Sequence, residues 1–171
     1  MRNGGGDEFD IVFSPAGAYI RGFDHESPMS PHVSDSVWPG VLDSVPEVFH
    51  AQVEEPAFMS GLPGVTFCLW RETGDARWHA GHIDFPHGHA DPDGSDWMLR
   101  LLRDPAPEAF AAFAEDYYEQ AVDLDAVRHV FEGQPLTRKT VTRLNPDASF
   151  TEISQEAKLM GYPVDPTDGP S

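Results

Sequence analysis

Two runs of β-prone residues, separated by a short polar turn, constrain the fold of this chain more than any other feature. The first run, VTFCLW, covers residues 65–70, and the second covers residues 77–85. The connection contains Glu72-Thr73-Gly74-Asp75, and a polar, glycine-containing connection of this kind is typical of a β-hairpin. Side chains alternate between the two faces of a strand, so Ile83 and Phe85 share one face, which we expect to point toward the core.

A second hairpin is predicted nearer the N-terminus. Residues 9–23 form two apolar runs around Ser14-Pro15-Ala16-Gly17, where the proline and the glycine favour a type I turn inside a slightly longer loop. The isoleucine, valine, phenylalanine and tyrosine of these runs suit a half-buried, pleated surface. Together the two hairpins predict one four-stranded antiparallel sheet.

Helical periodicity is typical of the rest of the chain. A short helix is predicted over residues 46–54, and later helices are predicted around Trp97, over residues 123–132, after Thr137 and after Ser149. The predicted fold class is therefore α+β: an N-terminal four-stranded antiparallel sheet of two hairpins, packed against a mostly helical C-terminal half.

The clearest helical pattern follows Asp104-Pro105, which we expect to start a helix. Its apolar residues recur at helical spacing and predict one buried stripe. That stripe consists of Phe110, Phe113, Ala114, Tyr117 and Ala121.

The length of the chain and the lack of an evident linker predict a single domain over residues 1–171. Within it we expect a flexible leader at 1–8, a sheet-rich half at 9–86, a helical half at 95–162 and a frayed tail at 163–171. The N-terminal residues lack the apolar region of a secretory signal, and the single cysteine, Cys68, cannot form an intramolecular disulfide. Both features predict a cytoplasmic location.

Charge is the strongest compositional feature. The chain has 11 basic and 29 acidic residues, a formal net charge of −18. Such a chain repels nucleic-acid phosphates and anionic membrane surfaces, and no apolar run approaches the roughly 20 residues needed to span a bilayer. We therefore expect no nucleic acid and no membrane as partner, and a basic protein becomes the favoured one. The alternative is that the charge serves solubility alone or follows from genome composition.

Negative charge is concentrated in residues 104–127, which contain seven carboxylates and neither lysine nor arginine. Unbalanced charge gives a helix no support from i,i+4 ion pairs, so folding does not require it. Electrostatic docking of a basic partner is one interpretation, and a solvated helical face is the other. The residues predicted to bind that partner are Glu108, Glu115, Asp116 and Glu119.

A histidine-rich segment is the only place where metal chemistry is predicted. Imidazole and carboxylate groups are ligands that zinc prefers. Strand alternation separates His79 from His82, but the loop after residue 86 could bring more ligands together. The predicted metal ligands are His82, His87, His89 and Asp84, and the loop with His25 and Glu26 would form the opposite wall of a cleft. The alternative is a set of ordinary polar loop residues.

Other catalytic patterns are missing from the sequence. It contains no nucleophile elbow, no phosphate-binding glycine loop and no dinucleotide fingerprint, and Cys68 lies within a predicted strand, where a thiol is usually inert. The favoured hypothesis is a non-enzymatic protein-binding module, an immunity- or antitoxin-like neutraliser or an adaptor, without a cofactor. The alternative is a small metal-dependent enzyme with a His/Asp site around residues 82–96 and bound zinc or another divalent metal.

Overall fold

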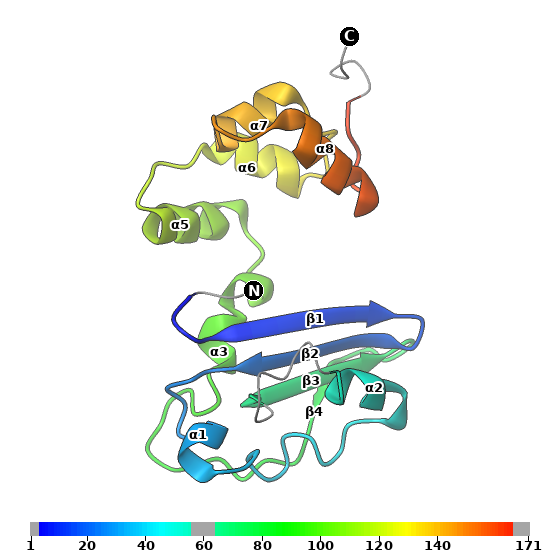
Figure 1. Cartoon of the computed structure of the whole chain (residues 1–171), viewed down its shortest axis with the longest axis vertical. Coiled ribbons are helices and arrows are strands. Elements are labelled where there is room, and N and C mark those ends of the chain that lie inside the picture. The colour runs from blue at the N-terminus through cyan, green and yellow to red at the C-terminus, as the bar shows by residue number, and fades with distance from the viewer. Residues whose placement is uncertain (1–3, 56–63, 166–171) are drawn as a thin grey trace. The chain divides into compact units, whose positions relative to one another are not determined.

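The computed structural model describes residues 4–55 and 64–165 (Figure 1). The chain divides into two compact units, one ending at Arg100 and the other beginning at Leu101. The first unit holds a four-stranded antiparallel sheet and the second unit is helical, so the predicted α+β class is confirmed. The single domain over residues 1–171 stays a prediction.

The sheet has the strand order β1-β2-β3-β4, with every neighbouring pair antiparallel. Its strands are β1 (Glu8–Ser14), β2 (Gly17–Phe23), β3 (Phe67–Glu72) and β4 (His79–Ala80). This is the predicted arrangement of two hairpins. The turn of the first hairpin is tighter than predicted, because Ser14 pairs with Gly17 and leaves a loop of only Pro15 and Ala16.

The second strand of the later hairpin is much shorter than predicted. It was expected over residues 77–85, yet only His79 and Ala80 pair with β3. The chain beyond Ala80 follows residues 38–41 instead: a Cβ on Gly81 would lie 1.7 Å from the Gly40 carbonyl oxygen, and Trp38 Nε1 donates to the Asp84 carbonyl at 3.0 Å. Residues 81–84 therefore contact residues 38–41 and do not continue the pairing with β3.

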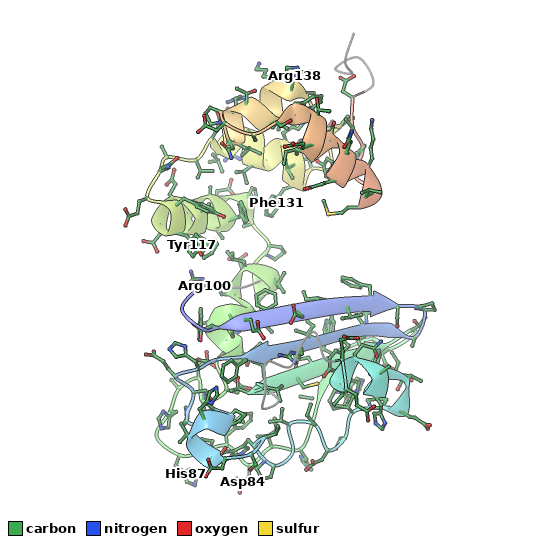
Figure 2. The ribbon with its side chains drawn as sticks, in the orientation of Figure 1. Asp84, His87, Arg100, Tyr117, Phe131 and Arg138 are labelled. Atoms are coloured by element: carbon green, nitrogen blue, oxygen red, sulfur yellow. The ribbon has the colours of Figure 1, made fainter. Side chains whose placement is uncertain are left out.

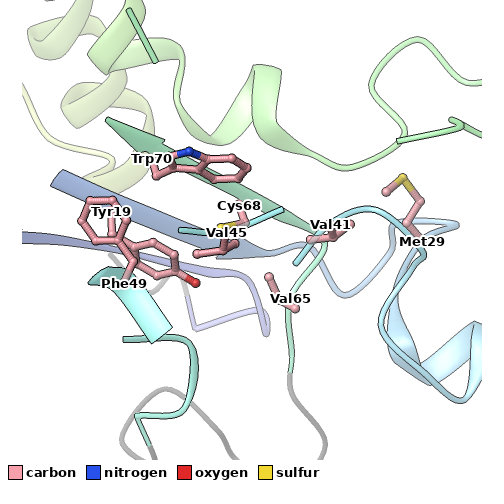
Figure 3. Packing of buried hydrophobic residues seen from close by; sticks show 8 residues of the cluster. All are labelled: Tyr19, Met29, Val41, Val45, Phe49, Val65, Cys68 and Trp70. Carbon is pink, nitrogen blue, oxygen red and sulfur yellow. The ribbon is translucent and has the colours of Figure 1, made fainter. Parts of the chain in front are cut away.

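Alternation along the central strands gives the sheet two apolar faces. Tyr19, Cys68 and Trp70 contribute to one face (Figure 3). The connection between β2 and β3 covers it with Met29, Val41, Val45, Phe49 and Val65. That connection includes α1 (Pro31–Ser34), the 3₁₀ helix η1 (Glu47–Phe49) and α2 (His50–Val53), the last two within the helix predicted over residues 46–54.

The opposite face of the sheet is covered by α3 (Ser95–Met98) and the residue after it. Ile20 and Phe67 project from this face and pack with Met98 and Leu99. Ile83 packs against the first face as predicted, but Phe85 is 45% exposed, contrary to prediction. The early end of its strand explains this, because residue 85 no longer follows the alternation of the sheet.

Arg21 is a buried cation of the first unit. Arg21 on β2 is 3% exposed, and its Nη2 donates to the Gly64 carbonyl at 3.0 Å and lies 3.3 Å from Glu8 Oε1. Its Nε is 3.9 Å from Asp10 Oδ2. Glu8 and Asp10 stand on the same side of β1, opposite Phe23 and Arg21. The carboxylates of the edge strand therefore compensate the buried charge of the strand beside it.

The short helix α4 (Arg100–Arg103) spans the boundary between the units. The second unit contains α5 (Pro107–Tyr118), α6 (Leu124–Phe131), α7 (Arg138–Leu144) and α8 (Phe150–Leu159). Side-chain oxygens of Asp123, Thr137 and Ser149 cap the last three, where the sequence predicted helix starts. Residues of α7 and α8 and of the segment before α7 form a core cluster of Leu136, Val141, Phe150 and Ala157.

Helix α5 differs from its prediction in two respects. It begins at Pro107 with Ala106 as N-cap, not at Asp104, and it ends at Tyr118, so Ala121 lies beyond it. Within the predicted stripe Ala114 is buried, but Phe110 is 39% exposed. Periodicity located the helix correctly but overestimated how much of its aromatic stripe is buried.

The predicted leader and tail lie partly outside the described residues. Two residues of the predicted leader are described: Asp7 Oδ1 accepts a hydrogen bond from His25 N, and Glu8 begins β1. In the tail, the Pro163 carbonyl accepts a hydrogen bond from Leu136 N at 2.8 Å, and Asp165 N donates one to the Leu136 carbonyl at 3.0 Å. These backbone bonds hold the start of the tail against the second unit.

Candidate functional site

The last turn of α5 and its C-cap have the sequence Glu115-Asp116-Tyr117-Tyr118-Glu119, which we call the α5 acidic terminus. All five residues are exposed. The turn contains no basic residue. A helix C-terminus carries partial negative charge, which favours lysine or arginine and disfavours carboxylates. The carboxylates of the α5 acidic terminus therefore add negative charge to a helix C-terminus whose backbone already carries partial negative charge.

The backbone at Glu119 is left-handed, with φ 53°. Glycine normally occupies such a C-cap, because a side chain costs about 1 kcal/mol or more there. The turn is held by the carboxylate of Glu115, whose Oε1 accepts a hydrogen bond from Val122 N at 3.1 Å. Neither the charge nor the backbone conformation of this segment is what helix stability alone would select.

Two tyrosines lie among these carboxylates. Tyr117, labelled in Figure 2, is 48% exposed, and Tyr118 is 63% exposed. Their ring centroids are 5.0 Å apart in an edge-to-face arrangement, and Tyr117 also stacks on Phe113 at 5.7 Å. The rings are thus fixed by one another. Exposed tyrosine side chains can attract a lysine or arginine side chain through cation–π contact.

The fourth predicted partner-binding residue, Glu108, has a different environment. Its Oε1 lies 2.7 Å from Arg128 Nη2 on α6, and this hydrogen bond is the main reason that the pKa of Glu108 is lowered. Arg128 also approaches Asp125 at 3.5 Å, and Arg143 pairs with Asp125 and Asp123. Three of the seven carboxylates of residues 104–127 therefore have arginine partners.

The pairing of Glu108 with Arg128 and of Asp123 with Arg143 was not visible in the acidic segment itself, since each arginine lies 20 positions from that carboxylate. Helix packing brings them together. The four predicted residues consequently fall into two groups: Glu108 belongs to an ion-pair network linking α5, α6 and α7, whereas Glu115, Asp116 and Glu119 belong to the α5 acidic terminus.

The predicted metal ligands lie in the first unit, after β4. His82, Asp84, His87 and His89 are all exposed, in a segment without helix or strand. Among the residues that the structure describes, one group of three or more histidine, cysteine or acidic residues has its ligand atoms within 4.8 Å of one another, and it consists of Asp7, Asp24 and His25. A metal bound by His82, Asp84, His87 and His89 stays a prediction.

His89 lines a hollow of about 360 Å³ together with Asp91, Asp93 and Asp96. Burial is the main cause of a raised pKa at Asp93, and the neighbouring Asp91 adds to it, while a hydrogen bond from Ser95 N acts in the opposite direction. The same carboxylate accepts that bond at 3.0 Å and so helps to form the turn before α3. A structural role accounts for these contacts.

The loop with His25 and Glu26 lies against residues 92–97. Ser27 Oγ donates to the Pro92 carbonyl at 2.6 Å, and Trp97 Nε1 donates to Asp24 Oδ2 at 3.0 Å. These contacts join the His25 loop to the turn before α3 and to α3 itself, and a cleft between this loop and residues 82–89 stays a prediction. Asp7 and Asp24 were missed, although the pairing of the first hairpin contains the signal: Glu8 pairs with Phe23, Asp7 comes just before Glu8, and Asp24 comes just after Phe23.

Cys68 is buried, and burial raises the pKa of its thiol to about 11. This environment agrees with the inert thiol that its position in a strand predicted.

No described helix has the length and apolar character needed to cross a membrane. Comparisons of the chain with protein-family models, with curated proteins and with solved structures gave no significant match.

Proposed function

We propose that this chain is a non-enzymatic protein-binding module and that its partner is a basic protein. The contact surface in this proposal is the α5 acidic terminus. The observation that carries the proposal is that three carboxylates occupy one helix C-terminus with no basic residue in the last turn. This arrangement lowers the stability of the helix, so helix stability does not explain it, whereas binding of a basic partner does.

Two further features support a basic partner. The net charge of −18 attracts a cationic protein over long range and raises the association rate. Tyr117 and Tyr118 add two exposed aromatic side chains beside the carboxylates. Aromatic residues often contribute much of the affinity of an interface, whereas exposed charges contribute mainly to rate and specificity.

The most concrete form of this proposal is a cytoplasmic neutraliser of a basic toxin, in the manner of an immunity protein or antitoxin. An adaptor for a basic protein uses the same surface. Nucleic acids and anionic membranes are disfavoured as partners, since both carry the same sign of charge as the chain.

The test is calorimetric titration of the full chain with oligolysine and oligoarginine peptides. The diagnostic variant is Glu115→Gln/Asp116→Asn/Glu119→Gln. A matched control, Glu132→Gln/Asp147→Asn/Glu156→Gln, removes three exposed charges elsewhere in the same unit. We expect the affinity for these peptides to fall as the salt concentration rises. We also expect the diagnostic variant to lose more affinity than the control does. Equal effects of the two variants would make net charge, and not this surface, responsible.

A metal-dependent enzyme with its site around residues 82–96 is the second candidate function. The hollow lined by His89, Asp91, Asp93 and Asp96 is the observation that favours it. Elemental analysis of protein purified without an affinity tag tests this candidate, together with the thermal shift on adding zinc. A lack of both stoichiometric metal and thermal shift would reject it.

A further inference from the structure

Antiparallel pairing assembles three potential ligands at one end of the first hairpin. Glu8 lies opposite Phe23, so Asp7, just before Glu8, and Asp24, just after Phe23, reach the same end of the sheet. His25 follows directly, and its backbone N–H donates to Asp7 Oδ1 at 3.0 Å. The positions of these residues are therefore set by the hairpin and not by a free loop.

The imidazole of His25 lies directly beside this carboxylate. Its Nδ1 is 2.7 Å from Asp7 Oδ1, and the ring is 41% exposed. Asp7, by contrast, is buried. A cation from solvent can therefore reach the histidine first, and the buried carboxylate forms the floor of the cluster.

Outer hydrogen bonds orient the second carboxylate. Asp24 Oδ1 accepts from Glu26 N at 2.9 Å, and Asp24 Oδ2 accepts from Trp97 Nε1 at 3.0 Å. A Cβ on Gly94 would lie 2.4 Å from Asp24 Oδ2, so glycine leaves the room that this carboxylate occupies. Metal ligands in proteins are commonly oriented by donors of this kind.

We propose that Asp7, Asp24 and His25 bind one divalent transition-metal cation, with zinc as the best match. One imidazole nitrogen and two carboxylate oxygens suit a borderline cation, whereas calcium and magnesium prefer ligands that are all oxygen. Zinc holds such atoms at about 2.0–2.2 Å, hence about 3.4 Å from one another. The three ligand atoms already lie within 4.8 Å of one another, so small side-chain rotations close the site.

Charge around the histidine favours the same conclusion. Glu26 Oε1 lies 4.0 Å from His25 Nε2, so three carboxylates surround one imidazole. Repulsion among like charges is relieved by a divalent cation. His25 Nδ1 lies 2.7 Å from Asp7 Oδ1, and a ligating nitrogen needs its lone pair, so a metal bound at Nδ1 displaces the proton of this hydrogen bond. This site belongs to the first unit and is independent of the proposed partner surface.

The test is titration of the full chain with zinc sulfate after removal of bound metal with a chelator. We expect one zinc per chain, release of protons seen as an enthalpy that depends on the buffer, and a change in tryptophan fluorescence from Trp97. His25→Gln should weaken binding at least tenfold. This variant retains the backbone bond to Asp7 and changes a half-exposed ring, so the fold is retained.

His89→Gln is the matched control, because it removes another exposed imidazole from the same unit. It should leave zinc affinity unchanged. The proposal is overturned if zinc does not bind saturably, if His25→Gln binds it as well as the unmodified chain does, or if His89→Gln is the variant that loses binding.

Discussion

The guanidinium of Arg128 lies 2.7 Å from the carboxylate of Glu108 and so joins α6 to α5. This contact lowers the pKa of Glu108 below its ordinary value. A carboxyl group whose pKa is lower in the folded chain stabilises the fold above its unfolded pKa, and that contribution is lost as the pH falls through the folded value.

Arg128→Gln should therefore lower the stability of the fold by a small amount at neutral pH, and this loss of stability should be smaller at acidic pH. The difference in urea midpoint between this variant and the unmodified chain should be greatest near pH 7 and should shrink as the pH falls below about 4. Equilibrium unfolding across this pH range is the measurement. A difference that does not change with pH would mean that Arg128 acts through packing and not through its ion pair.

Glu119→Gly should stabilise the second unit. Glu119 adopts a left-handed backbone with φ 53°, which glycine adopts without steric cost, and the gain expected is about 1 kcal/mol. Glu119→Ala is the control, since it removes the same carboxylate but keeps a Cβ. Thermal unfolding should rank the glycine variant above the alanine variant, and the reverse order would show that the left-handed turn costs the chain nothing.

Arg21→Met should destabilise the first unit strongly. The buried guanidinium is the cation beside Glu8 and Asp10, and removing it leaves these carboxylates and the Gly64 carbonyl without that partner. Breaking a buried ion pair costs about 3–5 kcal/mol, and the partial exposure of the two carboxylates places this case near the lower figure. Arg71→Met, at an exposed position on β3, should change urea unfolding by less than about 0.5 kcal/mol. Similar effects of both variants would contradict this account of Arg21.

The stability of Asp93→Asn relative to the unmodified chain should increase as the pH rises. Burial raises the pKa of Asp93, so the unfolded chain loses this proton at a lower pH than the folded chain does. Raising the pH from the ordinary carboxyl pKa through the raised one therefore favours unfolding. Asparagine keeps an oxygen for the Ser95 N–H bond and does not ionise. The stability of the variant relative to the unmodified chain should increase with pH in urea titrations, and a constant difference would contradict the prediction.

The sequence predicted the features that depend on local patterns. Alternation and turn residues predicted four strands, and Thr137 and Ser149 were recognised as helix starts, because capping depends on residues three positions apart. The length of β4 could not be predicted in this way. It depends on the contact between Gly81 and Gly40, which lie far apart in the chain.

The candidate sites were predictable to different degrees. Glu115, Asp116 and Glu119 could be identified because the acidic segment is continuous in sequence. The partner of Glu108 could not, since only helix packing brings Arg128 to it. The four predicted metal ligands follow one another in the chain, whereas the cluster of Asp7, Asp24 and His25 requires the register of β1 and β2.

The central claim is that the α5 acidic terminus binds a basic partner. The most direct test is the ratio of dissociation constants for one oligoarginine peptide, measured at about physiological ionic strength with the variant Glu115→Gln/Asp116→Asn/Glu119→Gln and with the control Glu132→Gln/Asp147→Asn/Glu156→Gln. The proposal predicts that the first variant binds at least tenfold more weakly than the control. Equal dissociation constants, or a peptide that binds neither these variants nor the unmodified chain, would contradict it.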